Sequence, residues 1–139
     1  MSTFPDIEMG VLELLEPLGE CYLRMPVGFE ALLDDDEISA LIHIADLGGV
    51  GGDEVFRTAR VRVTTYGAGR DAAKDPAEAA RDVLLDSPHG TEAGLLDRIT
   101  AETEPVAMPY PSDRVLTYQA VYRVDVRPIV TTTKETTNA

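Results

Sequence analysis

Hydrophobic and polar residues alternate almost without a break from Arg114 to Arg127, near the end of the chain. One set of alternate positions holds Leu116, Tyr118, Ala120, Tyr122, Val124 and Val126. The other set holds Thr117, Gln119, Val121, Arg123, Asp125 and Arg127. A period of two predicts a β-strand with one buried and one solvated face. At about 3.3 Å per residue the strand would be roughly 45 Å long, whereas an ordinary strand has about five or six residues.

Two further alternating runs flank a cluster of glycines. The first run has apolar residues at Ile38, Ala40, Ile42 and Ile44. The second, from Val55 to Tyr66, sets Ala59, Val61 and Val63 opposite Arg60, Arg62 and Thr64. Between them lie Gly48, Gly49, Val50, Gly51 and Gly52. Two strands around a glycine-rich link predict a β-hairpin with a long, mobile loop. Because glycines lose much entropy when they become ordered, we expect this loop to fold against a partner.

Two segments have helical rather than alternating periodicity. The first carries its apolar residues at Ile7, Val11, Leu14, Leu15 and Leu18. In the second, Asp75 is predicted to be the N-cap and Pro76 the first helical residue, since both residue types are common at these positions. Its apolar positions are Ala79, Ala80, Val83 and Leu84. Residues 70–74 are either an irregular lead-in or an extra turn, because a proline kinks a continuous helix.

These elements define the predicted fold. A further strand is expected from about Leu95 to Glu104, and a turn over Pro105–Pro111 leads into the long closing strand. Amphipathic helices need a sheet to cover, so we predict an α+β fold: an antiparallel sheet of about four strands packed by two helices, with a long glycine-rich hairpin loop. Residues 1–128 are expected to form a single domain, and residues 129–139 a flexible polar tail.

The composition is that of a globular protein. The chain has 139 residues, 44% of them hydrophobic and 27% charged. No apolar run approaches the roughly 18 residues of a membrane span, and the start of the chain lacks the pattern of a signal peptide. The single Cys21 excludes an internal disulfide and a cysteine-based metal cluster. We therefore expect a soluble, intracellular domain that does not bind a membrane.

The net charge of −13 is distributed unevenly along the chain. Residues 1–56 contain 13 acidic residues and one basic residue, Arg24, whereas residues 57–139 contain 12 acidic and 11 basic residues. This balance disfavours binding to nucleic acid, which requires clustered Lys and Arg. It suits a subunit whose acidic part contacts the arginine-bearing part of a neighbour. Alternatively, the acidic residues simply keep the protein soluble.

Motifs for catalysis or cofactor binding are weak. The glycine cluster lacks the Lys-Ser/Thr of a P-loop and the spacing of a dinucleotide-binding turn. The acidic run Asp34–Glu37 lacks the alternating ligands and central glycine of an EF-hand. Cys21 and His43 are only a pair of residue types, and His89 lies in a Pro-Gly turn. We predict no catalytic, cofactor-binding or metal-binding residues, and no enzymatic activity.

One resemblance to a known family covers roughly residues 5–128. Pro105 and Met108-Pro109-Tyr110 lead into RVLTYQAVYRVDVR, residues 114–127. This segment resembles the end of tail terminator proteins of long-tailed (siphovirus-type) phages of actinobacteria, where a proline–tyrosine turn precedes a strand of the form R-x-x-x-Y-x-A-x-Y-R-x-x-x-R. The resemblance extends to DIEMGVLELLEPLG, to LIHIADLGG and to RVRVTTYG with the helix after it. The chain departs from the family at Pro76 and at Met108, where an aromatic residue is usual.

The resemblance implies a structural virion protein made in the host cytoplasm. Such proteins form a hexameric ring that caps the tail tube and joins it to the head-side connector. The implied partners are further copies of the chain, the major tail tube protein and the head–tail connector protein, while DNA passes through the channel without specific binding. The long strand would then be core on one face and assembly surface on the other.

Three groups of residues are candidates for these contacts. The ring interface candidates are Arg57, Arg60, Arg62, Arg123 and Arg127. The partner-contact loop is Gly48, Gly49, Val50, Gly51 and Gly52. The candidates for a negative channel wall are Asp34, Asp35, Asp36 and Glu37, for which a solvated outer loop is the alternative. Other functions left open are a different connector, head-completion or tail-tube protein, a small ligand-binding module, and a small hydrolase using Cys21 or His43.

Overall fold

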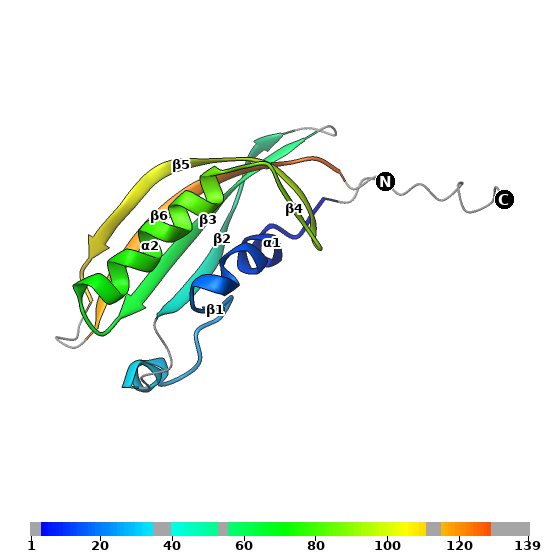
Figure 1. The fold of residues 1–139 in the computed structure, drawn as a ribbon. Coiled ribbons are helices and arrows are strands. Elements are labelled where there is room, and N and C mark those ends of the chain that lie inside the picture. The colour runs from blue at the N-terminus through cyan, green and yellow to red at the C-terminus, as the bar shows by residue number, and fades with distance from the viewer. Residues whose placement is uncertain (1–3, 35–39, 53–55, 111–114, 129–139) are drawn as a thin grey trace, which may run out of the picture.

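The computed structural model describes residues 4–34, 40–52, 56–110 and 115–128. These residues form two α-helices, two short 3-10 helices and six strands (Figure 1). The helical elements are α1 (Ile7–Leu15), η1 (Glu16–Leu18), η2 (Phe29–Asp34) and α2 (Arg70–Leu85). The strands are β1 (Glu20–Tyr22), β2 (Leu41–Gly52), β3 (Arg57–Gly67), β4 (His89–Thr91), β5 (Gly94–Met108) and β6 (Leu116–Val126).

All six strands belong to one curved sheet in the order β1-β2-β3-β6-β5-β4. The pair β1 and β2 is parallel, and the other pairs are antiparallel, so the sheet is mixed. The long strand β5 bends so that β4 lies beside α1 (Figure 1). The prediction of an antiparallel sheet of about four strands is therefore wrong. Its error lies in β1 and β4, because three residues are too few to produce a recognisable alternation.

Both helices pack on the same face of this sheet, which we call the helix face. Ile7, Val11 and Leu15 of α1 and Ala80 and Leu84 of α2 belong to one buried cluster with the strands. The strands contribute alternate residues, in register across the sheet: Ile44 beside Val63, Val63 beside Ala120, and Val61 beside Tyr122. These apolar contacts explain why the helices cover this face.

The closing strand β6 has the predicted alternation. Tyr118, Ala120, Tyr122, Val124 and Val126 are buried on the helix face, as expected. The strand spans 11 residues, so at about 3.3 Å per residue it is roughly 36 Å long, shorter than predicted. The alternate positions on the other face of β6 are more buried than the pattern predicts: Thr117 and Val121 are only 5% and 9% exposed.

The glycine cluster is part of a strand and does not form a long loop. β2 continues through Gly52, and Gly48, Gly49, Gly51 and Gly52 face residues 57–60 of β3, with two irregularities in the register. Gly48 and Gly52 have φ angles of +103° and +136°, which favour glycine. The hairpin loop was predicted wrongly because glycines leave no side-chain alternation to recognise. The residues between the strands, 53–55, lie outside the described residues.

Helix α2 begins at Arg70, so the extra turn before Pro76 exists. Gly69, and not Asp75, is the N-cap, and Pro76 lies inside the helix. The entry to α2 is tight, because a Cβ atom on Gly67 would lie 2.5 Å from the backbone carbon of Ala72. This close approach fixes the helix against the end of β3. The single domain over residues 1–128 stays a prediction, and the predicted tail, residues 129–139, lies outside the described residues.

Candidate functional site

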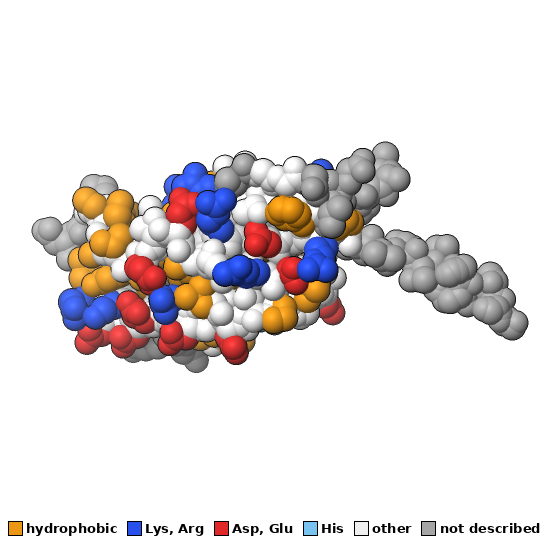
Figure 2. Space-filling model, turned by 90° about the horizontal axis from the view of Figure 1, so that it is seen from above, with side chains coloured by type: hydrophobic (Ala, Val, Ile, Leu, Met, Phe, Trp, Pro, Cys, Tyr) orange, Lys and Arg blue, Asp and Glu red, His pale blue; other side chains and the backbone are white. Residues whose placement is uncertain are grey.

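The face of the sheet away from α1 and α2 is here called the outer face. Among the described residues it carries no α-helix, and the 3-10 helix η2 contacts one end of it, where Phe29 meets Tyr66. Its residues include Arg60, Arg62 and Tyr66 of β3 and Gln119 and Arg123 of β6, which alternate with the buried positions. Viewed from above, Lys and Arg side chains are spread over the molecule with acidic side chains among them, and hydrophobic side chains gather at the left end and lie scattered elsewhere (Figure 2). A large uncovered sheet face is the main surface feature of the described residues.

Three of the five predicted interface arginines lie together on the outer face. Arg60 and Arg123 are directly opposite each other on β3 and β6, and Arg62 lies two residues from Arg60. Arg60 is held by a bidentate contact to Glu102, with Nε donating to Oε1 at 3.0 Å. Within the described part of the chain, neither Arg62 nor Arg123 forms an ion pair. Because Glu102 already engages Arg60, the charges of Arg62 and Arg123 remain for an anionic partner.

The other two predicted arginines lie elsewhere. The guanidinium of Arg57 sits 4.1 Å from the ring centroid of Phe4, close to the start of α1. Arg127, just beyond β6, donates from Nε to Asp97 at 3.1 Å. The structure therefore does not bring the five arginines into one cluster.

Arg98 is an outer-face arginine that sequence reasoning missed. It is exposed on β5 opposite Asp125, in the same sheet as Arg62 and Arg123. Register irregularities on both sides of this region disturb the alternation of β5, so the face of Arg98 is hidden in the sequence. The sequence signal that could have placed Arg98 on the outer face was its position directly before Ile99, which is buried on the helix face.

One end of the sheet carries an aromatic cluster. The rings of Phe29, Tyr66 and Tyr110 meet edge to face, with centroids 5.0 Å apart for Phe29–Tyr66 and 5.9 Å for Tyr66–Tyr110. The Tyr110 hydroxyl donates to Glu30 at 2.8 Å, and desolvation together with this contact raises the pKa of Tyr110 to about 12. The nearby ends of β5 and β6 expose three apolar side chains: Val106, which is 47% exposed, Met108 and Leu116.

The opposite end of the sheet is formed by the β2–β3 hairpin. Here Leu47 and Phe56 are 40% and 43% exposed on either side of the glycine segment. The predicted partner-contact residues Gly48–Gly52 thus occupy a strand end between exposed apolar side chains. Of the predicted channel residues, Asp34 ends η2, and Asp35, Asp36 and Glu37 lie outside the described residues.

Cys21 and His43 do not form a catalytic pair. Cys21 is opposite Ile42 in the sheet and packs toward the helix face, whereas His43 follows on the outer side and donates from Nε2 to the Leu23 carbonyl at 3.3 Å. Burial, with Glu16 and Glu20 nearby, raises the pKa of Cys21 to about 12, so the thiol is protonated at neutral pH. His89 bonds the Leu84 carbonyl at 3.2 Å, at the end of α2. These contacts give each of the three residues a structural role.

No protein-family model matches the chain, and no curated protein matches its sequence. No helix among the described residues has both the length and the apolar character needed to cross a membrane.

Proposed function

We propose that this protein is a tail terminator, a structural virion protein that forms a ring on the head-proximal end of a phage tail tube and joins it to the head-side connector. The observation that carries the proposal is the uncovered outer face of the sheet. It bears arginines without an ion pair in the described region, Arg62, Arg98 and Arg123, and it lies between two ends with exposed apolar side chains. Together with the resemblance of residues 105–127, this surface favours assembly.

The distribution of surface chemistry suits a ring with two different axial partners. Lateral contacts in a ring are head-to-tail, so each subunit needs two different complementary surfaces. Axial contacts would use the two ends of the sheet: the aromatic end around Tyr66 and Tyr110, and the hairpin end around Leu47. Exposed hydrophobic patches of this kind are typical of protein–protein contacts.

The proposed partners are those that the resemblance to tail terminators implies. Six copies of the chain would form the ring, with the major tail tube protein on one side and the head–tail connector protein on the other. The protein would be made in the host cytoplasm and would remain in the tail of the virion. DNA would pass through the ring, and Asp34–Glu37 remain the proposed acidic part of the channel.

Electron microscopy of purified tail tubes incubated with the protein tests this function. The expected result is extra density at one end of each tube and no further tube growth, because a terminator stops at one ring. Tubes incubated with buffer are the control. Stacked rings formed by this protein alone would identify a tube protein, and failure to attach to tube ends would contradict the proposal.

A matched pair of variants locates the axial contact. Leu47→Asp places a charge on the exposed hairpin end, whereas Met108→Asp places the same charge at the aromatic end. If each end contacts a different partner, one variant should abolish attachment to tubes, and the other should leave attachment intact while blocking head joining. Equal behaviour of the two variants in both assays would contradict the two-ended arrangement.

A further inference from the structure

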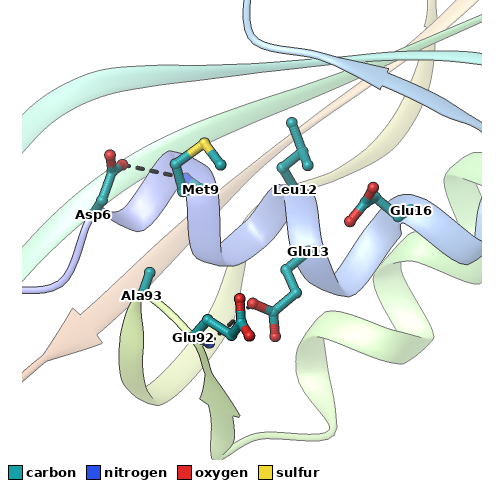
Figure 3. Close-up of a pocket in the computed structure, with 7 residues that line it drawn as sticks. All are labelled: Asp6, Met9, Leu12, Glu13, Glu16, Glu92 and Ala93. Carbon is teal, nitrogen blue, oxygen red and sulfur yellow. Dashed lines mark hydrogen bonds between the residues drawn. The ribbon is translucent and has the colours of Figure 1, made fainter.

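A groove follows α1 opposite the turn between β4 and β5 (Figure 3). It has a volume of about 610 Å³. We call it the acidic groove; it is lined by Asp6, Met9, Leu12, Glu13, Glu16, Glu92 and Ala93. Four of these side chains are carboxylates and none is a Lys or Arg, while Met9 and Leu12 supply apolar surface.

Two carboxylates of the acidic groove, those of Glu13 and Glu92, lie close together, while Asp6 and Glu16 lie at the two ends of α1 (Figure 3). The backbone N–H of Glu92 donates to the Glu13 carboxylate at 2.9 Å, so that the two acidic side chains lie side by side (Figure 3). Asp6 caps α1 by accepting from the N–H of Met9 at 3.2 Å. Within the described residues, none of the four carboxylates forms an ion pair. Repulsion between the adjacent Glu13 and Glu92 carboxylates is relieved by a cation.

The combination of apolar and acidic surface selects a particular kind of cation. Met9 is 45% exposed, so an aliphatic chain can lie along it. A long cationic side chain buries its methylenes on such a surface and keeps its charged head among the carboxylates. Arginine fits best, because its planar guanidinium can bond two carboxylates at once.

Arginines of this kind are present on the outer face of the same molecule. Arg62, Arg98 and Arg123 have no ion pair in the region that the structure describes, whereas the neighbouring Arg60 is paired with Glu102. They cannot reach the acidic groove of their own chain, because α1 packs on the opposite face of the sheet.

We propose that the acidic groove of one subunit accepts the arginines Arg62, Arg98 and Arg123 of a second copy, and that this contact closes the ring. The proposal rests on the ring of the proposed function and adds its lateral interface. The two surfaces differ and lie on opposite sides of the sheet, so the contact is head-to-tail, the kind that forms rings. Charge complementarity favours a second copy as the occupant: the groove is lined by four carboxylates and by no Lys or Arg, whereas the outer face offers three arginines without an ion pair in the described residues. The carboxylates on that face are already engaged, Glu102 by Arg60 and Asp125 by the hydroxyl of Thr58.

The interface also has apolar surface to contribute. A stable interface needs about 800 Å² from each partner, more than a few ion pairs provide. Leu95 follows closely after the groove residue Ala93 and is 46% exposed, and Met9 of the groove is 45% exposed. The charges would then select the partner surface, and burial of these side chains would add affinity.

Charge reversal tests the contact. Sedimentation velocity is measured on the full chain, on the double variant Arg62→Glu/Arg123→Glu and on the double variant Glu16→Lys/Glu92→Lys. Each double variant brings like charges together, so its association should weaken by roughly tenfold or more. A 1:1 mixture of the two should regain the assembly of the unmodified chain, because every contact in an alternating ring is again complementary.

Matched controls separate a specific contact from a change in net charge. Arg70→Glu/Lys74→Glu and Asp82→Lys/Asp86→Lys change the net charge by the same amounts on α2 and at its C-cap, at residues that belong to neither surface. They should assemble like the unmodified chain. Thermal unfolding of each variant checks that it folds.

The outcomes distinguish this contact from the proposed function. If the unmodified chain forms rings that cap tail tubes but the mixture does not regain assembly, or the controls disrupt it equally, the groove contact is overturned and the function stands. If the unmodified chain stays monomeric both alone and with tail tubes, both are overturned.

Discussion

Tyr122 illustrates at the scale of one residue how the core tolerates a polar atom. Its side chain is only 1% exposed, and its hydroxyl has no hydrogen-bond partner among the described residues. Burial raises the pKa of Tyr122, and the nearby carboxylate of Glu104 acts in the same direction. The hydroxyl is therefore protonated at neutral pH and costs free energy on folding.

Replacing Tyr122 with Phe should accordingly not destabilise the protein. Removing a buried hydroxyl without a partner is neutral or raises the free energy of unfolding by up to about 1 kcal/mol, because the ring keeps its packing. Urea unfolding of Tyr122→Phe measures this. A loss of more than about 1 kcal/mol would mean that the hydroxyl has a favourable contact.

Gly67 and Gly51 provide a matched pair of substitutions. A Cβ atom at Gly67 would overlap the backbone at Ala72 and Ala73, whereas one at Gly51 would meet no atom within 4 Å. Gly67→Ala should lower the free energy of unfolding by about 2–3 kcal/mol, since backbone must shift. Gly51→Ala should change it by less than about 1 kcal/mol. Equal effects in a thermal unfolding assay would contradict the tight connection between β3 and α2.

The raised pKa of Cys21 predicts slow alkylation. Thiolates react and thiols do not, so a pKa of about 12 in place of 9.0 leaves about a thousandfold less reactive form at pH 8. Iodoacetamide should modify the folded protein slowly at pH 8 and faster as the pH rises toward 12. The chain unfolded in urea should react at the ordinary rate. Fast labelling of the folded protein at pH 8 would contradict the buried position of the thiol.

At the scale of secondary-structure elements, periodicity was informative wherever side chains alternate over several turns or strand residues. The apolar stripe of α1 and the alternation of β6 predicted both elements and the faces they bury. The same reasoning failed for β1 and β4, which are held in place by pairing with longer strands and have only three residues each.

The candidate site was predictable only in part, for a related reason. Arg60, Arg62 and Arg123 were found because regular alternation fixes the face on which they lie. Arg57 and Arg127 belong to strand ends, where contacts with Phe4 and Asp97 determine the position of the side chain. The acidic groove brings α1 together with Glu92, more than 70 residues away along the chain. Such a juxtaposition depends on the bend of β5, which no local pattern encodes.

Pro76 in α2 gives a prediction at this scale. A proline inside a helix cannot donate to the carbonyl four residues before it, here that of Ala72, and this omission costs up to about 3 kcal/mol. Part of the gain on replacement is offset because the unfolded chain becomes more flexible. Pro76→Ala should therefore raise the free energy of unfolding by about 1–2 kcal/mol in urea. A destabilised variant would mean that the proline ring makes packing contacts that outweigh its missing hydrogen bond.

At the scale of the whole molecule, the uneven charge along the sequence becomes an uneven charge in space. Residues 1–56 provide the acidic surface along α1, and the later strands provide the arginines of the outer face. Exposed charge pairs are screened over about 8–10 Å at physiological ionic strength, so assembly through these surfaces depends on salt. The core, which is apolar, should be much less sensitive.

Native mass spectrometry of the purified chain at increasing ionic strength tests the ring most directly. The expected result is one closed species, with a mass six times the 15.1 kDa of the chain at low salt, that gives way to monomer as the salt concentration rises. A monomer at every salt concentration, a dimer, or an open series of ever larger masses would contradict a ring closed by head-to-tail charge pairing.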